Sequence, residues 1–157
     1  MTGQKLGHYE ILDKIGEGGM GQVWRARDAR LNRSVAIKIL SADLAGDPAR
    51  RQRFEQEARA LGALNHPNIV SVYDVGQSDG RAYIVSELVE GESLRSAMER
   101  GPIAGRRLFE MATQMAEAIA AAHALGIVHR DLKPENIMIS APQAGAPGRV
   151  KARALPL

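Results

Sequence analysis

The strongest constraint on the fold is a run of glycines between two stretches that alternate apolar and polar residues. Four of the six residues from Gly16 to Gly21 are glycine. The segments on either side, 9–15 and 23–27, both have the two-residue period of a β-strand. Because glycine adopts backbone conformations that other residues rarely reach, this pattern predicts a tight β-hairpin.

The glycines follow the spacing G-x-G-x-x-G, which occurs in several phosphate-binding loops. A dinucleotide-binding turn needs a helix after its third glycine, but residues 22–26 are strand-like. A Walker A loop ends in Gly-Lys-Ser or Gly-Lys-Thr, whereas this chain has Gly21-Gln22-Val23. Two interpretations remain open: a hairpin that binds nothing, and a flap whose backbone N–H groups cover phosphates.

The rest of the first half predicts three more strands and one helix. The strands are expected at 34–40, 69–75 and 82–89, and the turn 76–80 joins the last two. Asp47-Pro48 suits the start of a helix, and His66-Pro67 suits its end. The helix has an apolar face made of Phe54, Ala58, Leu61 and Leu64. These elements predict a mostly antiparallel sheet of five strands with one helix.

After Glu90 the sequence changes to a helical pattern. Helices are predicted at 93–100 and 106–125, followed by short strands at 137–139 and from 150. The long helix carries an apolar stripe of Leu108, Met111, Met115, Ile119 and Ala122, with Glu110, Gln114 and Glu117 opposite. The chain as a whole is therefore predicted to be of the α+β class.

Composition narrows the function. The chain has 157 residues, of which 45% are hydrophobic and 25% charged, as is ordinary for a globular domain. It has no cysteine, which excludes disulfides, thiolate metal sites and a Cys nucleophile. The net charge of +3 is spread along the chain, so no nucleic-acid partner is expected. No signal peptide or membrane segment is recognisable, and the expected location is cytoplasmic.

Two charged residues stand among apolar neighbours. Lys38 lies in Val35-Ala-Ile-Lys-Ile-Leu40, the most apolar strand of the first half. Glu57 lies between Phe54 and Leu61 and leans toward the apolar face of its helix. Because a buried lysine normally has a partner, an ion pair between helix and sheet is one interpretation. The other is a lysine whose amino group reaches solvent, with a glutamate at the helix edge.

The loop after the long helix is unusually rich in polar groups. Six of its residues fall within eight positions between two apolar segments: His129, Arg130, Asp131, Lys133, Glu135 and Asn136. A plain turn rarely gathers acid, base and amide groups so closely. This density indicates a catalytic or binding loop.

Taken together, these residues resemble the eukaryotic-type protein kinase family, which also occurs in bacteria. The matching motifs are the glycine-rich segment 15–23, Val35-Ala-Ile-Lys38 and His129-Arg-Asp-Leu-Lys-Pro-Glu-Asn136. The form Lys133-Pro-Glu-Asn136 is typical of kinases that act on serine and threonine. The resemblance covers about residues 9–151. It implies a nucleotide-binding N-lobe at 9–88, part of a C-lobe at 89–151 and a tail outside the family at 152–157.

The resemblance also implies roles for individual residues. It assigns ATP binding to Ile15, Gly16, Glu17, Gly18, Gly19, Met20, Gly21, Val23, Ala36, Lys38, Glu87 and Val89. Lys38, held by Glu57, would orient the α- and β-phosphates, and Asp131 would accept the proton of the substrate hydroxyl. Lys133 would neutralise charge on the transferred phosphoryl group, and Asn136 would bind Mg²⁺. The implied partners are ATP and a protein with a reactive Ser or Thr.

The sequence departs from the family near its C-terminal end. The family has Asp-Phe-Gly two residues after the Val-Lys that here is Val150-Lys151, but this chain has Ala154-Leu155-Pro156. Without that metal-binding Asp, the chain is expected to be a truncated kinase domain with weak activity or none. The alternatives are a non-catalytic module that binds ATP or acts as a scaffold, and a non-functional gene fragment.

Overall fold

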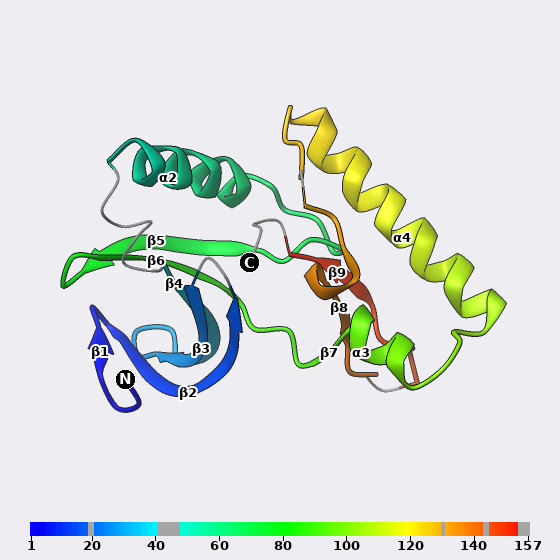
Figure 1. The fold of residues 1–157 in the computed structure, drawn as a ribbon, viewed down its shortest axis with the longest axis horizontal. Helices are drawn as coiled ribbons and strands as arrows, with labels where there is room; N and C mark the ends of the chain where they lie inside the picture. Colours follow the sequence, from blue (N-terminus) through cyan, green and yellow to red (C-terminus); the bar gives the residue numbers. More distant parts are fainter. Residues whose placement is uncertain (19–20, 41–47, 130, 143–144, 154–157) are drawn as a thin grey trace. The chain divides into compact units, whose positions relative to one another are not determined.

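The structure, a computed structural model, describes residues 1–18, 21–40, 48–129, 131–142 and 145–153, with the side chains at 18, 50, 51, 53, 54 and 57 left aside. The chain forms two compact units. The first contains Met1–Ala63 and Ser71–Leu88, and the second contains Leu64–Val70 and the described residues from Val89 onward. Figure 1 shows the elements of each unit.

The first unit is an antiparallel sheet in the strand order β1-β2-β3-β4-β6-β5. Its strands are β1 (Lys5–Leu6), β2 (Tyr9–Gly18), β3 (Gly21–Asp28), β4 (Arg33–Leu40), β5 (Val72–Ser78) and β6 (Arg81–Glu87). The α+β class is confirmed, but the sheet has one strand more than the five predicted. The added strand β1 is short and pairs only with the start of β2.

The strand predicted at 69–75 begins later, at Val72, and that prediction was wrong at its N-terminal end. Ile69 instead forms an isolated parallel bridge with Ala152 of the second unit's sheet. The β5–β6 connection is tighter than the predicted turn, because β5 continues to Ser78. Asp79 and Gly80 both have positive φ angles, 51° and 73°, as a two-residue type I′ turn requires.

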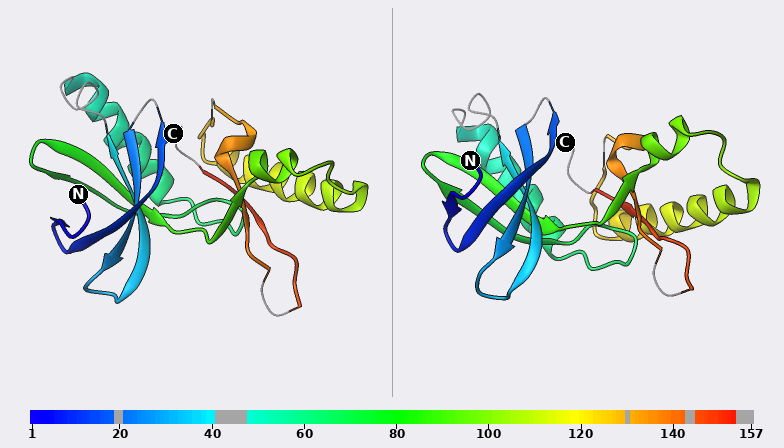
Figure 2. Two further views of the ribbon diagram at one scale, coloured as in Figure 1. Left: turned by 60° about the horizontal axis from the view of Figure 1, so that its bottom comes forward. Right: turned by 90° about the horizontal axis from the view of Figure 1, so that it is seen from below.

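Alternation along the strands builds the core of the first unit. Trp24, Ala26 and Asp28 of β3 are buried, while Arg25 and Arg27 between them are exposed. The core lies on one face of the sheet and includes Ile11, Trp24, Val35, Ile37 and Val85. Helix α2 (Pro48–Gly62) runs beside β5, and its Ala58 and Leu61 are buried. In Figure 2 the strands β2 to β4, coloured from blue to cyan, are strongly curved.

A buried carboxylate organises the turn between β3 and β4. Asp28 is 1% exposed, and its Oδ1 accepts hydrogen bonds from the backbone N–H groups of Arg30 and Leu31. Burial acts to raise the pKa of Asp28, but these two bonds and the nearby His8 and Arg33 outweigh it. The pKa of Asp28 therefore lies below its ordinary value.

The second unit combines a small sheet with one long helix. Its elements are β7 (Gly91–Ser93), α3 (Leu94–Glu99), α4 (Gly105–Ala124), the 3₁₀ turn η1 (Pro134–Asn136), β8 (Ile137–Ser140) and β9 (Val150–Ala152). The strands follow the order β7-β8-β9, so β9 is an edge strand. Met111 and Met115 of α4 pack with Ile137, Val150 and Ala152 to form its core. Helix α4 ends at Ala124, and Gly126 just beyond it has a φ of 73°, which suits a left-handed helix terminus.

The predicted apolar stripe of α4 is only partly buried. Met111, Met115 and Ala118 are buried, but Leu108 is 53% exposed and its neighbour Phe109 is 75% exposed. On the other flank, Arg107 donates to the carbonyl of Gly148, and Gln114 accepts from the N–H of Val150. These polar contacts join that flank to β9 and to the residue two positions before it. Within the described residues, no helix is long and apolar enough to span a bilayer.

Candidate active site

The glycine segment forms the end of the β2–β3 hairpin. Gly16 pairs with Val23, Glu17 with Gln22 and Gly18 with Gly21, while Gly19 and Met20 lie outside the described residues. Glu17 is exposed and accepts from Lys14 Nζ at 2.6 Å and from Gln22 Nε2 at 3.2 Å. These contacts hold the pKa of the Glu17 carboxyl below its usual value. Side chains of the hairpin itself thus hold the Glu17 carboxylate.

Two of the glycines differ in what the fold demands of them. Gly21 has a φ of 143°, and a Cβ built on it would lie 2.0 Å from the carbonyl oxygen of Ile39 on β4. Only glycine fits there. A Cβ on Gly16 would meet only the Cβ of Val23, at an ordinary contact distance of 3.8 Å. The fold therefore demands glycine at 21, whereas a Cβ at position 16 would find room.

The strand register brings several of the predicted ATP-binding residues to one face of the sheet. Gly16 pairs with Val23, and Val23 pairs with Lys38, which places the three in one row across β2, β3 and β4. Directly paired residues of antiparallel strands share a face. Val35, Ile37 and Ile39 belong to the core, so Ala36 and Lys38 occupy the opposite face.

Lys38 is 8% exposed, so the prediction of a buried lysine is confirmed. The side chain of Glu57 lies outside the described residues, and its ion pair with Lys38 stays a prediction. Ala36 is buried as well, whereas Ile15 is 44% exposed. Glu87 is the last residue of β6. Its backbone N–H donates to the carbonyl of Ser71, and its side chain accepts from the N–H of Ser71. Val89 is the first residue of the second segment of the other unit.

The loop after α4 brings three of the predicted catalytic side chains together. Oδ2 of Asp131 accepts a hydrogen bond from Asn136 Nδ2 at 3.1 Å and lies 3.2 Å from the Lys133 ammonium. The same Nδ2 donates to the backbone carbonyl of Asp131 at 2.9 Å. Arg130 lies outside the described residues. An acid, a cation and an amide thus lie within one group of polar contacts.

His129 has a supporting role that was not assigned from the sequence. Its Nδ1 accepts from the backbone N–H of Asp131 at 3.3 Å, so the ring proton belongs on Nε2. Nε2 then donates to the carbonyl of Arg153 at 2.5 Å. The ring connects the start of the loop to the residue after β9. Its place in the polar run was visible in the sequence, but its partner Arg153 is 24 residues away.

Asn136 offers an oxygen suited to a metal ion. It is 0% exposed, and both contacts of its Nδ2 are to acceptors, which fixes the amide with Oδ1 on the other side. Oδ1 has no hydrogen-bond partner within the described residues. A buried, unsatisfied amide oxygen is unfavourable by about 1–3 kcal/mol, and hard oxygen atoms are the ligands that Mg²⁺ prefers. Asn136 is therefore suited to hold the Mg²⁺ ion that the resemblance to protein kinases implies.

The loop's other acid is engaged elsewhere. Glu135 Oε1 accepts from Nε of Arg95 on α3 at 2.9 Å, and Nη2 of the same arginine lies at 2.8 Å. A hydrogen bond from its own backbone N–H and the guanidinium of Arg95 lower the pKa of the Glu135 carboxyl. Nowhere in the described residues, the loop included, do three or more His, Asp or Glu side chains form a group that could hold a metal ion.

Comparison with known proteins identifies the class to which this fold and loop belong. The chain belongs to the protein kinase domain family, whose model it matches over residues 9–151. It is 48% identical over 140 residues to the serine/threonine-protein kinase PknA of Mycobacterium tuberculosis, an alignment that covers 85% of this chain and 32% of that protein. It is 43% identical over 144 residues to the serine/threonine-protein kinase pkn2 of Myxococcus xanthus, covering 92% and 17% of the two chains.

The fold comparison agrees with the sequence comparison. The crystal structure of the PknI kinase domain of Mycobacterium tuberculosis matches with a TM-score of 0.85 and 27% identity. The match covers 99% of this chain and 62% of that domain. The chain thus spans a third or less of the curated relatives and under two thirds of that kinase domain. Kinases of this family are transferases that use ATP and Mg²⁺.

Proposed function

We propose that this chain binds ATP with Mg²⁺ and carries the catalytic loop of a protein kinase directed at serine and threonine. The observation that carries the proposal is the group formed by Asp131, Lys133 and Asn136, with the amide oxygen of Asn136 left for a metal ion. Family membership supports the same chemistry. The location of the chain in the cell and the identity of its protein substrate stay predictions.

In this proposal the residues that bind the nucleotide belong mainly to the first unit. The backbone of the glycine segment, Gly16, Glu17, Gly18, Gly19, Met20 and Gly21, covers the phosphates. Ile15, Val23 and Ala36 contact the adenine, and Glu87 and Val89 provide backbone contacts at its edge. Lys38, with Glu57 as its partner, orients the α- and β-phosphates. The shared face of Gly16, Val23, Ala36 and Lys38 supports this arrangement.

The catalytic loop supplies the groups for phosphoryl transfer. The Asp131 carboxylate orients a Ser or Thr hydroxyl and accepts its proton as the new O–P bond forms and the bond to the leaving diphosphate breaks. The Lys133 ammonium offsets negative charge on the transferred group. Asn136 would hold Mg²⁺, which when bound neutralises phosphate charge.

Residue 154 limits the expected rate. The family has a metal-binding Asp at this position and this chain has Ala, so transfer by the chain alone should be very slow. This substitution favours a second candidate function, a module that binds ATP without catalysis. The two candidates share nucleotide binding and differ only in turnover.

Calorimetric titration with ATP and Mg²⁺ tests nucleotide binding. We expect heat of binding for the natural chain and its loss in Lys38→Met, while Lys5→Met, an exposed lysine of β1 outside the row, behaves like the natural chain. Circular dichroism checks that both variants are folded. Absence of heat in the natural chain would overturn the proposal.

Incorporation of phosphate into a basic protein substrate tests turnover. We expect a negligible rate. A robust rate that disappears in Asp131→Asn would show that the chain is a competent kinase despite Ala154.

A further inference from the structure

The outer edge of β9 is closed by groups from two other segments. In an antiparallel pair the residues of an edge strand point their N–H and C=O groups alternately toward the partner strand and away from it. Arg149 and Arg153 exchange backbone bonds with the β8 side, at Ser140 and Asn136. The backbone groups of Val150 and Ala152 therefore point away from β8 and need other partners.

All four of these outward groups are satisfied. The N–H of Val150 donates to Gln114 Oε1 at 2.9 Å, and its carbonyl accepts from Asn68 Nδ2 at 2.8 Å. The N–H of Ala152 donates to the carbonyl of Asn68 at 2.8 Å, and its carbonyl accepts from the N–H of Val70 at 2.9 Å. The segment 64–70 thus lies along β9 as a partner strand would, and Gln114 completes the row.

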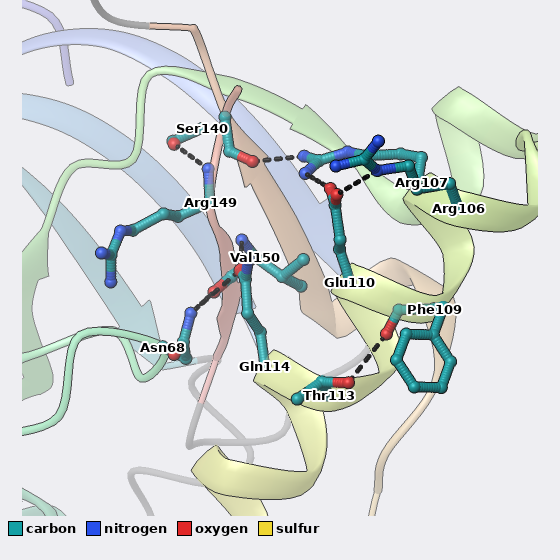
Figure 3. A network of polar contacts seen from close by, with 11 residues as sticks. Asn68, Arg106, Arg107, Phe109, Glu110, Thr113, Gln114, Ser140, Arg149 and Val150 are labelled. Atoms are coloured by element: carbon teal, nitrogen blue, oxygen red, sulfur yellow. Dashed lines mark hydrogen bonds and ion pairs between the residues drawn. The ribbon is translucent and has the colours of Figure 1, made fainter. Parts of the chain in front are cut away.

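Gln114 closes a ring of hydrogen bonds at this edge (Figure 3). Its Oε1 accepts from both the Val150 N–H and Asn68 Nδ2, the second bond being 3.1 Å long, and Asn68 Nδ2 also reaches the Val150 carbonyl. Asn68 is 2% exposed and Val150 is 0% exposed. Loss of the single oxygen of Gln114 would leave donors of both residues without this acceptor, in a place where water cannot readily replace it.

The end of β9 fixes the catalytic loop. The residue after β9, Arg153, donates its N–H to the carbonyl of Asn136 at 2.8 Å and accepts from His129 Nε2. A displacement of β9 is therefore passed directly to the two ends of the loop that holds Asp131. The path from Gln114 to Asn136 runs through one three-residue strand.

We propose that Gln114 is a positioning residue for the catalytic loop. Its side-chain oxygen sets the position of β9, and β9 sets the positions of Asn136 and His129 through the backbone of Arg153. Gln114 itself lies on α4 and contacts neither end of the loop. The inference deepens the proposed function and rests on it only where it concerns metal and nucleotide binding.

Amide hydrogen exchange on the full chain, followed by NMR, tests the positioning. Gln114→Met keeps the length of the side chain and removes the acceptor. We expect the Arg153 amide, which donates to Asn136, to exchange about tenfold faster, the change that loss of one or two buried hydrogen bonds produces. Gln114→Glu keeps an acceptor oxygen at the same place and should restore slow exchange.

Met115→Ala is the matched control. Met115 is the next residue of α4 and is 9% exposed in the core against β9, but it acts through apolar packing. At equal loss of thermal stability, it should leave the Arg153 amide close to its natural exchange rate. The inference is overturned if exchange of the Arg153 amide accelerates equally in Met115→Ala and Gln114→Met, or if Gln114→Glu does not restore slow exchange. Gln114 would then only stabilise the fold. If Gln114→Met does not fold, Asn68→Ser breaks the same ring and must accelerate Arg153 in its place.

A second measurement separates this inference from the proposed function. Mn²⁺ with ATP broadens the side-chain amide signal of Asn136 if the metal binds there. Broadening in the natural chain that needs a higher Mn²⁺ concentration in Gln114→Met supports both ideas. An unchanged midpoint in Gln114→Met overturns the positioning role alone. Absence of broadening in the natural chain overturns metal binding by Asn136, and the exchange experiment still decides the role of Gln114.

Discussion

The contrast between Gly16 and Gly21 gives a prediction that separates folding from binding. Replacing either glycine by alanine adds the same single carbon atom to the same hairpin. At Gly21 that carbon would lie 2.0 Å from the Ile39 carbonyl oxygen, and the φ of 143° disfavours any residue with a Cβ. At Gly16 the new carbon meets only Val23, at 3.8 Å. Gly21→Ala should therefore disturb the fold, and Gly16→Ala should not.

The geometry gives the size of each effect. A non-glycine residue held in such a conformation is unfavourable by about 1–3 kcal/mol, and the overlap with a backbone atom adds about 1–3 kcal/mol. We therefore expect Gly21→Ala to lower the free energy of unfolding of the first unit by about 2–6 kcal/mol. Gly16→Ala restricts the unfolded chain without strain and should raise that free energy by up to about 1 kcal/mol. A nucleotide phosphate close to the backbone at Gly16 would still be displaced by the added carbon.

Urea unfolding followed by tryptophan fluorescence measures the difference. Trp24 is the only tryptophan of the chain and lies in the core of the first unit, next to the hairpin. With a dependence on urea of about 2 kcal/mol per molar, Gly21→Ala should lower the unfolding midpoint by about 1–3 M. Gly16→Ala should unfold at or above the natural midpoint but bind ATP more weakly in the calorimetric titration. Equal midpoints for the two variants would refute the structural reasoning, and unaltered ATP affinity in Gly16→Ala would refute the role of that glycine in binding.

Three further predictions concern stability and the exposed surface. The pKa of Asp28 is lower in the folded state than its value of 3.8 in the unfolded chain. The ionised carboxylate therefore stabilises the fold fully above pH 3.8, and this stabilisation is lost as the pH falls through the folded pKa. Asp28→Asn should remove the resulting fall of the urea midpoint at acid pH. Met111→Ala, at a residue 3% exposed, should destabilise the second unit by about 2–5 kcal/mol, lowering the midpoint of the helical circular dichroism signal while the Trp24 transition stays in place. Phe109 is 75% exposed, so Phe109→Gln should reduce binding of an apolar dye and self-association without lowering the thermal midpoint.

The strands of the first unit were largely predictable because each carries its own periodic pattern. The segment 34–40 was predicted as a strand, and β4 covers Arg33–Leu40 with a fully buried second part. The start of β5 was misplaced because Ile69 and Val70 are as apolar as a strand requires. Their partner is β9, more than 80 residues away in the sequence. A local pattern shows that backbone is buried but does not identify the segment that pairs with it.

The candidate site divides in the same way. Asp131, Lys133 and Asn136 were found together because they lie within six positions of one another and needed only a local turn to meet. The ion pair of Lys38 with Glu57 depends on the packing of α2 against the sheet and stays a prediction. His129 was visible only as part of a polar run, since its second partner is the backbone of Arg153.

Gln114 shows most clearly why part of a site escapes sequence reasoning. From the sequence it is expected opposite the apolar stripe of the long helix, where periodicity alone predicts a side chain that faces solvent. Its oxygen instead accepts a hydrogen bond from the backbone N–H of Val150. Val150 is fully buried at the edge of the sheet, so this N–H needs an acceptor that no neighbouring strand supplies. The sequence shows β9 as a short apolar segment and Gln114 as a polar residue 36 positions earlier, with nothing local to connect them.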